Sequence, residues 1–130
     1  MKLQYMTKNK NSLLSKITGL FKITILTNTL YFIVMENIFK MGELKPEVVY
    51  DLKGSIVNRK SKKKSLLLDV DWIESNEKLD LSSEHSNLLI QQIKNDAFFL
   101  KDLNLMDYSL LLGIFNVKDN LKYFLFFFQF

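Results

Sequence analysis

The most apolar stretch of this 130-residue chain, residues 17–39, is interrupted by polar residues at short intervals. A membrane-spanning helix needs about 20 predominantly apolar residues, and this stretch contains Lys22, Glu36 and several threonines and asparagines. Residues 20–26 instead alternate as a strand does, and the sequence TNT that follows is typical of a turn. Residues 30–36 complete a predicted hairpin, and their nearly continuous apolar run predicts burial on both faces of the second strand.

The middle of the chain is predicted to contain further short strands. Residues 37–47 include a glycine and the single proline of the chain, so we expect a connector there. A third strand is predicted over residues 47–53, followed by a polar loop over residues 54–65. Residues 66–73, with the sequence LLLDVDWI, are predicted to form a short strand or the approach to one.

The clearest helix prediction covers residues 81–105. Ser82 or Ser83 can cap its N-terminus, and Glu84 is well placed in its first turn against the helix dipole. Residues 106–117 are predicted to form a loop that leads into an apolar strand. The predicted fold is therefore α+β, with antiparallel strands and one long helix. The apolar stripe of the helix, at a spacing typical of core packing, comprises Leu89, Ile93, Ala97 and Leu100.

The composition limits the kinds of site that the chain can build. A length of 130 residues and a hydrophobic content of 48% suit one globular domain. The absence of cysteine excludes disulfides and thiolate zinc sites within the chain, and it fits a reducing compartment. The single histidine, His85, excludes a histidine metal cluster and is expected at the helix surface. The net charge of +4 allows phosphate, an acidic membrane or nucleic acid as a partner without choosing among them.

The chain has 17 lysines but a single arginine, Arg59, which lies in the segment YDLKGSIVNRK at residues 50–60. Arginine can make a bidentate contact with phosphate or carboxylate, whereas lysine cannot. In the same segment Lys53 follows the third predicted strand, and Gly54 allows the backbone to approach a ligand closely. The segment therefore indicates an anion-binding site, and a solvated loop is the alternative.

Several stretches of the chain together resemble the phosphatidylinositol phosphate kinase family. Their order and approximate spacing are similar to the family's too, so we expect a partial catalytic domain over residues 12–117, with residues 1–11 and 118–130 outside the resemblance. The stretches are SLLSKITGLFKI (12–23), YFIVMEN (31–37), DLKGSIVNR (51–59), LDVDWI (68–73) and DAFFLKDLNLMDYSLLLGI (96–114).

The resemblance implies a two-lobed fold, distantly like that of protein kinases. It also implies transfer of the γ-phosphate of ATP, with Mg²⁺, to an inositol ring hydroxyl of a membrane phosphoinositide. A protein with this activity is expected in the cytoplasm, peripheral at an anionic membrane surface. Phosphoryl transfer depends mostly on positioning and charge stabilisation. The residues to look for are therefore cations near the phosphates and a carboxylate near the attacking hydroxyl.

The resemblance assigns roles to residues of the two signature motifs. Asp107 of MDYSLL is similar to the family's catalytic-loop aspartate, which acts as base or orients the hydroxyl. Lys53 of DLKGS is similar to a lysine that faces the phosphates, and Asp51 is expected to orient Lys53 or its neighbours. Asn58 and Arg59 are similar to a pair that contacts a lipid phosphate. A turn aspartate and solvated cations are the alternative interpretations.

Two further groups of residues follow from the resemblance. Met35, Glu36 and Asn37 are similar to the hinge between the lobes, whose backbone meets the adenine of ATP. Asp69 and Asp71 resemble a metal pair, but the family's metal site lies elsewhere in its sequence. We therefore predict structural roles for these two aspartates and assign no metal site.

A basic run follows the first signature, and an aromatic run closes the sequence. The basic run is either a solvated loop or a patch that faces an anionic membrane, where each basic residue contributes about 1 kcal/mol. It lacks interleaved aromatic residues, so nucleic-acid binding is not expected. The run YFLFFFQF at residues 123–130 is assigned to no element, and nothing in the sequence is expected to cover it. The basic residues are Lys60, Lys62, Lys63 and Lys64.

Three parts of the family's site have no counterpart in this sequence. In the family a glycine-rich loop and an ATP-binding lysine precede the matching region, and a magnesium-binding aspartate follows it. Residues 1–11 contain neither of the first two, and Asp119 comes too soon to be the third. We therefore expect a truncated fragment with little or no activity. The alternatives are a non-catalytic relic that binds phosphoinositide membranes or a protein partner through its basic residues, and an α+β domain without a present function.

Overall fold

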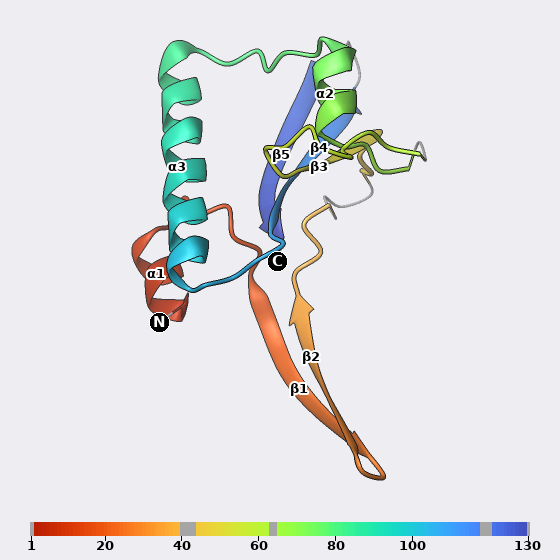
Figure 1. The fold of residues 1–130 in the computed structure, drawn as a ribbon. Coiled ribbons are helices and arrows are strands. Elements are labelled where there is room, and N and C mark those ends of the chain that lie inside the picture. The colour runs from red at the N-terminus through yellow and green to blue at the C-terminus, as the bar shows by residue number, and fades with distance from the viewer. Residues whose placement is uncertain (1, 40–43, 63–64, 118–120, 130) are drawn as a thin grey trace.

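The computed structural model describes residues 2–39, 44–62, 65–117 and 121–129. Within these ranges, three helices and two antiparallel sheets make up the regular structure (Figure 1). This arrangement confirms the prediction of mixed helices and antiparallel strands. In chain order the elements are α1 (Lys2–Lys8), β1 (Ile17–Ile25), β2 (Asn28–Met35), β3 (Val48–Leu52), α2 (Asp69–Ser75), α3 (Ser83–Asp102), β4 (Ser109–Val117) and β5 (Leu121–Gln129).

A three-stranded antiparallel sheet with the order β3-β4-β5 forms the centre of the molecule. β4 takes the middle position because its sequence SLLLGIFNV is a nearly uninterrupted apolar run, which suits a strand buried on both faces. Single parallel bridges extend both edges, one from Leu14 to Phe128 of β5 and one from Leu67 to Tyr50 of β3. Segments distant in sequence therefore cover the edges of this sheet.

One apolar cluster joins α3 to the C-terminal strand. Leu14, Leu100 and Phe128 are almost fully buried, at 2%, 0% and 3% exposure. Ile93 and Ala97 of the predicted helical stripe pack against them. Three of the four residues of the stripe, Ile93, Ala97 and Leu100, therefore face the core, as their spacing predicted.

A second apolar cluster lies between the sheet and α2. Its buried members are Tyr50 of β3 and Leu112 and Ile114 of β4. The ring of Trp72 in α2 meets that of Tyr50 edge-on, at a centroid distance of 5.1 Å. This contact fixes the short helix α2 against the strand that leads into the candidate site.

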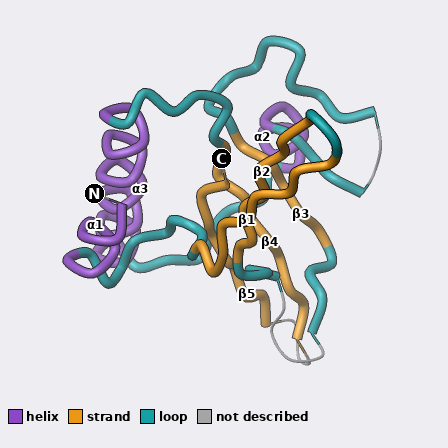
Figure 2. Tube along the Cα trace, turned by 90° about the horizontal axis from the view of Figure 1, so that it is seen from below, coloured by secondary structure: helices purple, strands orange, loops and turns teal. Residues whose placement is uncertain are grey.

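α3 is the predicted long helix, and α1 packs alongside it (Figures 1 and 2). Ser82 caps α3, because its Oγ accepts a hydrogen bond from the backbone N–H of His85. His85 lies at the surface, and its Nδ1 is 2.8 Å from the same hydroxyl. α1, which the sequence analysis did not predict, stacks the Tyr5 ring on Phe99 of α3 with ring centroids 3.9 Å apart.

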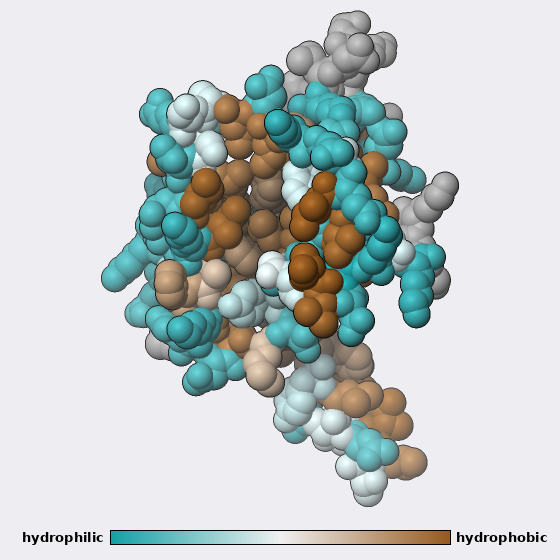
Figure 3. Space-filling view, turned by 45° about the horizontal axis from the view of Figure 1, so that its top comes forward, coloured by the Kyte–Doolittle hydropathy of each residue, from teal (hydrophilic) through white to brown (hydrophobic). Residues whose placement is uncertain are grey.

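β1 and β2 form the predicted hairpin, which extends away from the rest of the molecule (Figure 1). The prediction that β2 is buried on both faces is wrong. Tyr31 and Ile33 are 68% and 51% exposed, and apolar side chains lie on the surface of the protruding hairpin (Figure 3). The physical reason is that, in the described part of the chain, β1 and β2 pair only with each other. Among the described residues, no second layer covers either face of the hairpin.

Residues 66–73 do not form the predicted strand. Leu67 does pair with β3, but the chain turns into α2 at Asp69. Asp71 Oδ2 accepts the backbone N–H of Leu68, and this bond closes the first helical turn. Asn76 ends the helix in the left-handed conformation, with φ of 52°. The apolar run LLL predicted a strand, but the acidic residues after it favour the start of a helix.

The C-terminal aromatic run is the strand β5, which the sequence analysis missed. β5 pairs along its length with β4, with Ser109 opposite Gln129. Phe128 is 3% exposed, and Phe124, Phe126 and Phe127 are half-buried. The expectation that nothing covers these phenylalanines is therefore wrong, because α3, α2 and the segment around Leu14 cover much of them.

An apolar recess of about 590 Å³ lies between α3 and the sheet. Ile93, Trp72 and Phe128 contribute to its walls, and the loop after β3 forms part of its rim. Apolar side chains line the hollow beside α3 in the space-filling view (Figure 3). Among the helices that the structure describes, none combines the length and the apolar character needed to cross a membrane.

Candidate active site

The candidate site lies where β3 ends and β4 begins. In the antiparallel register, Leu52 at the end of β3 is opposite Leu110 near the start of β4. Lys53 directly follows β3 and Asp107 lies just before β4, so both residues lie beyond the same end of this strand pair. Lys53 Nζ lies 2.9 Å from Asp107 Oδ1, although the two residues are 54 positions apart in the sequence. Strand register thus brings together two of the residues that the sequence analysis singled out.

Asp107 is held in an unusual conformation and in its charged form. Its φ of 61° lies in the left-handed region, which non-glycine residues seldom adopt and which recurs at functional sites. Its side chain is 93% exposed, whereas that of Lys53 is 33% exposed. The hydrogen bond from Lys53, and then its positive charge, hold the pKa of Asp107 below the ordinary 3.8. Asp107 is therefore an ionised acceptor open to solvent at neutral pH.

Arg59 lies between two carboxylates of its own chain. Its Nε donates to Asp69 Oδ2 at 2.8 Å, and its Nη2 donates to Asp51 Oδ1 at 2.6 Å and to the Asp51 carbonyl oxygen. The Arg59 side chain is 16% exposed. Burial lowers its pKa, but the bonds and charges of the two aspartates outweigh this and raise it. The expected contact with a lipid phosphate stays a prediction. A phosphate would be bound by those N–H groups of Arg59 that do not bond to Asp51 or Asp69.

The loop after β3 closes around the carboxylate of Asp69. Asp69 Oδ1 accepts the backbone N–H of Gly54 at 2.8 Å and that of Lys53 at 3.0 Å. Gly54 has a φ of +70°, a conformation that costs little only for glycine. Burial raises the pKa of Asp69, but the bonds from Arg59, Lys53 and Gly54 outweigh it and lower the pKa. Asp69 therefore holds together the loop after β3 and Arg59, and its predicted structural role stays a prediction.

Asn58 and Asp51 lie on either side of this loop. Asn58, with a φ of 56°, is in the left-handed conformation and turns the chain just before Arg59. Asp51 Oδ2 accepts a hydrogen bond from Ser109 Oγ at 3.2 Å, in addition to the bonds from Arg59. Asp51 therefore ties β3 to the start of β4, two residues after Asp107.

Two adjoining cavities connect the Lys53–Asp107 pair to the expected hinge. The first, of about 460 Å³, is lined by Lys53, Asp107 and Asp51 among others. The second, of about 290 Å³, is lined by all three expected hinge residues: Met35, Glu36 and Asn37. Three residues line both cavities, namely Phe39, Leu111 and Gln129. A ligand that reaches from the hinge to Lys53 would pass across these three side chains.

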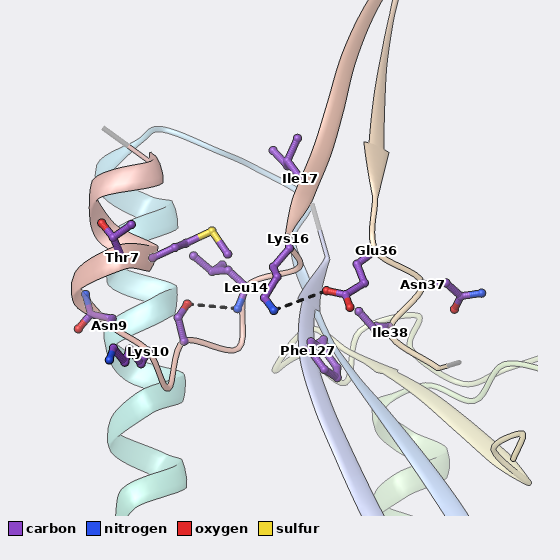
Figure 4. Close-up of a pocket in the computed structure, with 12 residues that line it drawn as sticks. Thr7, Asn9, Lys10, Leu14, Lys16, Ile17, Glu36, Asn37, Ile38 and Phe127 are labelled. Carbon is purple, nitrogen blue, oxygen red and sulfur yellow. Dashed lines mark hydrogen bonds and ion pairs between the residues drawn. The ribbon is translucent and has the colours of Figure 1, made fainter. Parts of the chain in front are cut away.

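The expected hinge is bonded both to the residue that precedes β1 and to the connector that follows β2. The backbone N–H of Glu36 donates to the Lys16 carbonyl at 3.0 Å, and the Glu36 side chain is 3.8 Å from Lys16 Nζ. Figure 4 shows these two side chains reaching toward each other from the ends of β2 and β1. Asn37 Oδ1 accepts the backbone N–H of Phe39 and so shapes the start of the connector. Lys16 and Glu36 also line a further cavity of about 480 Å³.

Comparison with known proteins assigns the chain to a family. The sequence model described as Phosphatidylinositol-4-phosphate 5-Kinase matches residues 3–123. The chain belongs to this lipid kinase family. The match includes the DLKGS and MDYSLL motifs that supply Lys53 and Asp107.

Individual relatives of the chain are members of the same kinase family. Phosphatidylinositol 5-phosphate 4-kinase type-2 gamma of Rattus norvegicus is 37% identical over 121 residues, which cover 88% of this chain and 29% of the relative. The type-2 alpha enzyme of Gallus gallus is 35% identical over 114 residues, covering 83% and 28%. A probable phosphatidylinositol phosphate kinase of Dictyostelium discoideum is 37% identical over 119 residues, covering 86% and 16%. The chain thus spans less than a third of the length of these curated relatives.

Membership of a kinase family implies the use of ATP, and the absence of the family's magnesium-binding aspartate from this sequence stays a prediction. Within residues 2–39, 44–62, 65–117 and 121–129, no group of three or more aspartates, glutamates or histidines is placed to hold a metal ion. Asp51 and Asp69 accept bonds from Arg59, and Asp107 accepts one from Lys53. Each of these three carboxylates is therefore engaged by a cationic side chain of the same chain. Asp119 lies outside the described residues.

Only part of the basic run is available to contact an anionic membrane. Lys60 Nζ lies 2.7 Å from both carboxylate oxygens of Glu74, so its charge is paired. Lys62 is exposed. Lys63 and Lys64 lie outside the described residues. Of the two lysines of the basic run that the structure describes, one is therefore already paired with a carboxylate.

Several residues that line the site were not predicted from the sequence. Ser109 is bonded to Asp51, and Phe39 and Gln129 line both cavities. Ser109 lies inside the MDYSLL motif, so the motif itself could have signalled it. Gln129 enters the site only because β5 pairs with β4, and no local sequence signal indicates that pairing.

Proposed function

We propose that this chain supplies the nucleotide-facing and hydroxyl-facing residues of a phosphatidylinositol phosphate kinase. In this proposal the backbone of residues 35–37 meets adenine, Lys53 contacts the phosphates, and Asp107 accepts a hydrogen bond from the attacking inositol hydroxyl. The hairpin and hinge belong to a small lobe, and α3 with the β3-β4-β5 sheet belongs to a large lobe, as in a kinase. Membership of the lipid kinase family supports this assignment.

The observation that carries the proposal is the 2.9 Å contact between Lys53 Nζ and Asp107 Oδ1. The ammonium group has three N–H donors, so Lys53 can hold Asp107 and a phosphate oxygen at the same time. Such an arrangement places a cation at the phosphoryl group and an anion at the nucleophile. Phosphoryl transfer is catalysed mainly by this kind of positioning and charge stabilisation.

The lowered pKa of Asp107 defines what this residue does in the proposed reaction. A carboxylate with a pKa below 3.8 is a weak base but remains ionised at neutral pH. It therefore accepts a hydrogen bond from the hydroxyl and aims the oxygen at the γ-phosphate. Because the transition state is loose, the hydroxyl proton does not need to leave before the new bond forms.

The proposed substrate is a phosphatidylinositol phosphate at an anionic membrane surface, with ATP as the phosphoryl donor. The family description names a 5-kinase of the 4-phosphate, whereas the vertebrate relatives are named as 4-kinases of the 5-phosphate. The proposed substrate class is accordingly phosphatidylinositol phosphates, with no ring position assigned.

We also propose that the 130-residue chain has little or no turnover by itself. Among the described residues, no group of three or more carboxylates or histidines is placed to hold a metal ion, and the charge that develops at the γ-phosphate needs a metal counterion. A kinase assay with phosphoinositide vesicles, ATP and Mg²⁺ is expected to yield no product above a protein-free blank. Product formation by the purified chain would show that this part of the proposal is wrong.

Nucleotide binding tests the proposal directly. ATP added to ¹⁵N-labelled chain is expected to shift the amide signals of residues 36–39, 53–55 and 107–111. Lys53→Met should weaken this binding by roughly tenfold, because it removes a charge-assisted bond to phosphate. Lys122→Met is the matched control, since Lys122 is bonded to Glu77 and lines neither cavity. The absence of saturable shifts, or equal weakening by the two substitutions, would contradict the proposed site.

The alternative proposal is a relic that binds anionic membranes without catalysis. The exposed Lys62 favours it, but Lys53, Arg59 and Lys60 are each paired with a carboxylate. Sedimentation with phosphoinositide vesicles at increasing salt would measure this binding. Replacement of Lys60, Lys62, Lys63 and Lys64 by alanine should release the chain from vesicles if the patch is the binding surface. Unchanged sedimentation would remove the patch from consideration.

A further inference from the structure

Asp69 is a buried carboxylate for which the proposed reaction has no direct use. The residue is 7% exposed and stands at the first position of α2. Its two oxygens accept the backbone N–H of Lys53, and Asp69 lines neither of the cavities that join the hinge to Asp107. A buried charge at this position needs an explanation, because an aspartate is seldom buried unless it is paired or hydrogen-bonded.

Three successive backbone N–H groups converge on this carboxylate. The N–H groups of Gly54 and Lys53 lie 2.8 and 3.0 Å from Asp69 Oδ1, and that of Ser55 lies at 3.4 Å. Consecutive N–H groups that surround one anion form a nest, which requires a left-handed residue. Gly54 supplies it, with a φ of +70°. The loop therefore has the shape of an anion receptor, and the anion is a side chain of the same protein.

A second set of bonds links the same carboxylate to the strand that carries Asp107. Arg59 bridges Asp69 Oδ2 and Asp51 Oδ1, at 2.8 and 2.6 Å. Asp51 in turn accepts a hydrogen bond from Ser109, the first residue of β4. Asp69 thus contacts the loop of Lys53 directly, and it is linked to the neighbourhood of Asp107 through two intermediates. Both halves of the Lys53–Asp107 pair depend on one network.

We propose that Asp69 is a positioning residue of the site, whose carboxylate fixes the loop over residues 53–55 so that Lys53 Nζ meets Asp107. The role of that pair in phosphoryl transfer rests on the proposed function, but the positioning itself does not. Only a carboxylate meets the requirement, because its oxygens accept bonds and donate none. An asparagine of the same shape would turn an N–H₂ group toward the N–H groups of the loop or toward Arg59.

The position of Asp71 provides a matched control. Asp71 is also an aspartate of the first turn of α2, and its Oδ2 accepts the backbone N–H groups of Ser61 and Leu68. Replacement of either aspartate by asparagine should weaken the start of α2 to a similar degree. Only Asp69→Asn should disturb the nest, because the bonds to Lys53 and Gly54 end on Asp69.

The test compares wild-type chain, Asp69→Asn and Asp71→Asn by NMR. In Asp69→Asn, the Gly54 amide proton should exchange with solvent faster by roughly tenfold or more, because its partner is lost. The carboxyl signal of Asp107 should titrate at higher pH than in the wild type, because Lys53 no longer stays beside it. In Asp71→Asn both properties should equal those of the wild type. A purely structural role of Asp69 would leave the Asp107 titration unchanged, and that result would overturn the proposal.

A measurement on the wild type keeps the proposal testable if Asp69→Asn does not fold. The amide signals of residues 53–55 should move with acid at the same midpoint as the carboxyl signal of Asp69 itself. A different midpoint would overturn the proposal. None of these readouts uses a nucleotide, so a failure of ATP to bind the wild type would refute the proposed function and leave the positioning role to be decided by the Asp107 titration.

Discussion

The hydroxyl of Tyr5 donates a 2.9 Å hydrogen bond to Oδ1 of Asp96, across 91 positions of the chain. Asp96 is fully buried in α3, and it also accepts bonds from Ser12 Oγ at 2.9 Å and from the backbone N–H of Leu13 at 2.7 Å. One carboxylate therefore fastens both α1 and the segment before β1 to the long helix. That segment continues into the hairpin and the expected hinge, so Asp96 fixes where the hinge begins.

Loss of the Asp96 carboxylate is expected to destabilise the whole domain. Asp96→Asn replaces an acceptor of three bonds by a group that must turn an N–H₂ toward some of the same donors. The free energy of unfolding should fall by about 2–3 kcal/mol, as is typical of a buried hydrogen bond to a charged group. Urea unfolding measures this. Asp102→Asn, at an exposed position of the same helix, is the control and should change the stability little. Equal midpoints for the two variants would contradict the anchoring role.

The stability that Tyr5 contributes should disappear at alkaline pH. Burial, and then the bond and charge of Asp96, raise the pKa of Tyr5 from 10.0 to about 12. A group whose pKa is raised by folding stabilises the folded state fully below pH 10, and this contribution is lost as the pH rises toward about 12. The difference in unfolding free energy between wild type and Tyr5→Phe should therefore be constant below pH 10 and shrink above it. A difference that does not change over this range would show that Tyr5 does not ionise at the interface with α3.

The Lys53–Asp107 contact should be visible in the titration of Asp107. The pKa of Asp107 is held below 3.8 by the hydrogen bond and charge of Lys53. A lowered pKa means that the contact stabilises the folded state above that pH and is lost as the pH falls through the lowered value. In Lys53→Met the carboxyl midpoint, followed by ¹³C NMR, should rise toward 3.8. Lys60→Met should leave the midpoint unchanged, because Lys60 is paired with Glu74 instead.

Local patterns predicted some elements correctly because the required information is local. The Ser82 cap and the spacing of Ile93, Ala97 and Leu100 act within a few positions of the chain. The hairpin was also predicted, but its turn is at residues 26–27, because two residues of the predicted turn TNT belong to β2. The helix α2 was mispredicted for the opposite reason. The apolar run before Asp69 favours a strand, and the bond from Leu68 N–H to Asp71 that starts the helix outweighs it.

The candidate site was predictable as a set of residues but not as an arrangement. The single arginine indicated a bidentate contact with one anion, but Arg59 instead contacts two different carboxylates through one nitrogen each. The anions in the structure are Asp51 and Asp69 of the same chain, and a motif cannot distinguish them from a phosphate. Likewise, the contact of Lys53 with Asp107 depends on the β3–β4 register, which the sequence does not specify.

Hydrogen exchange should separate the hairpin from the central sheet. A two-stranded hairpin without a covering layer is marginally stable, and most described side chains of β1 and β2 are exposed. Their amides should therefore exchange much faster than those of β4, whose residues Leu111, Leu112, Ile114 and Phe115 are buried. Equal protection in the two sheets would show that the apolar surface of the hairpin is covered in solution.

Gly113 in β4 should be intolerant of a methyl group because of Phe39. A Cβ at Gly113 would lie 2.7 Å from a ring carbon of Phe39 and 3.2 Å from one of Phe115. Phe39 also lines both cavities between the hinge and Lys53, so Gly113→Ala should push its ring into the proposed nucleotide path. Overpacking of this kind lowers the unfolding free energy by about 1–3 kcal/mol.

A double-mutant cycle identifies Phe39 as the cause. In a Phe39→Ala background, Gly113→Ala should destabilise the protein far less, because the ring that it would meet is gone. The interaction energy between the two substitutions should then be about 1 kcal/mol or more, measured by urea unfolding of all four proteins. Additive effects would mean that the ring of Phe39 does not lie against Gly113 in solution. The connector between the hinge and β3 would then be held by other contacts.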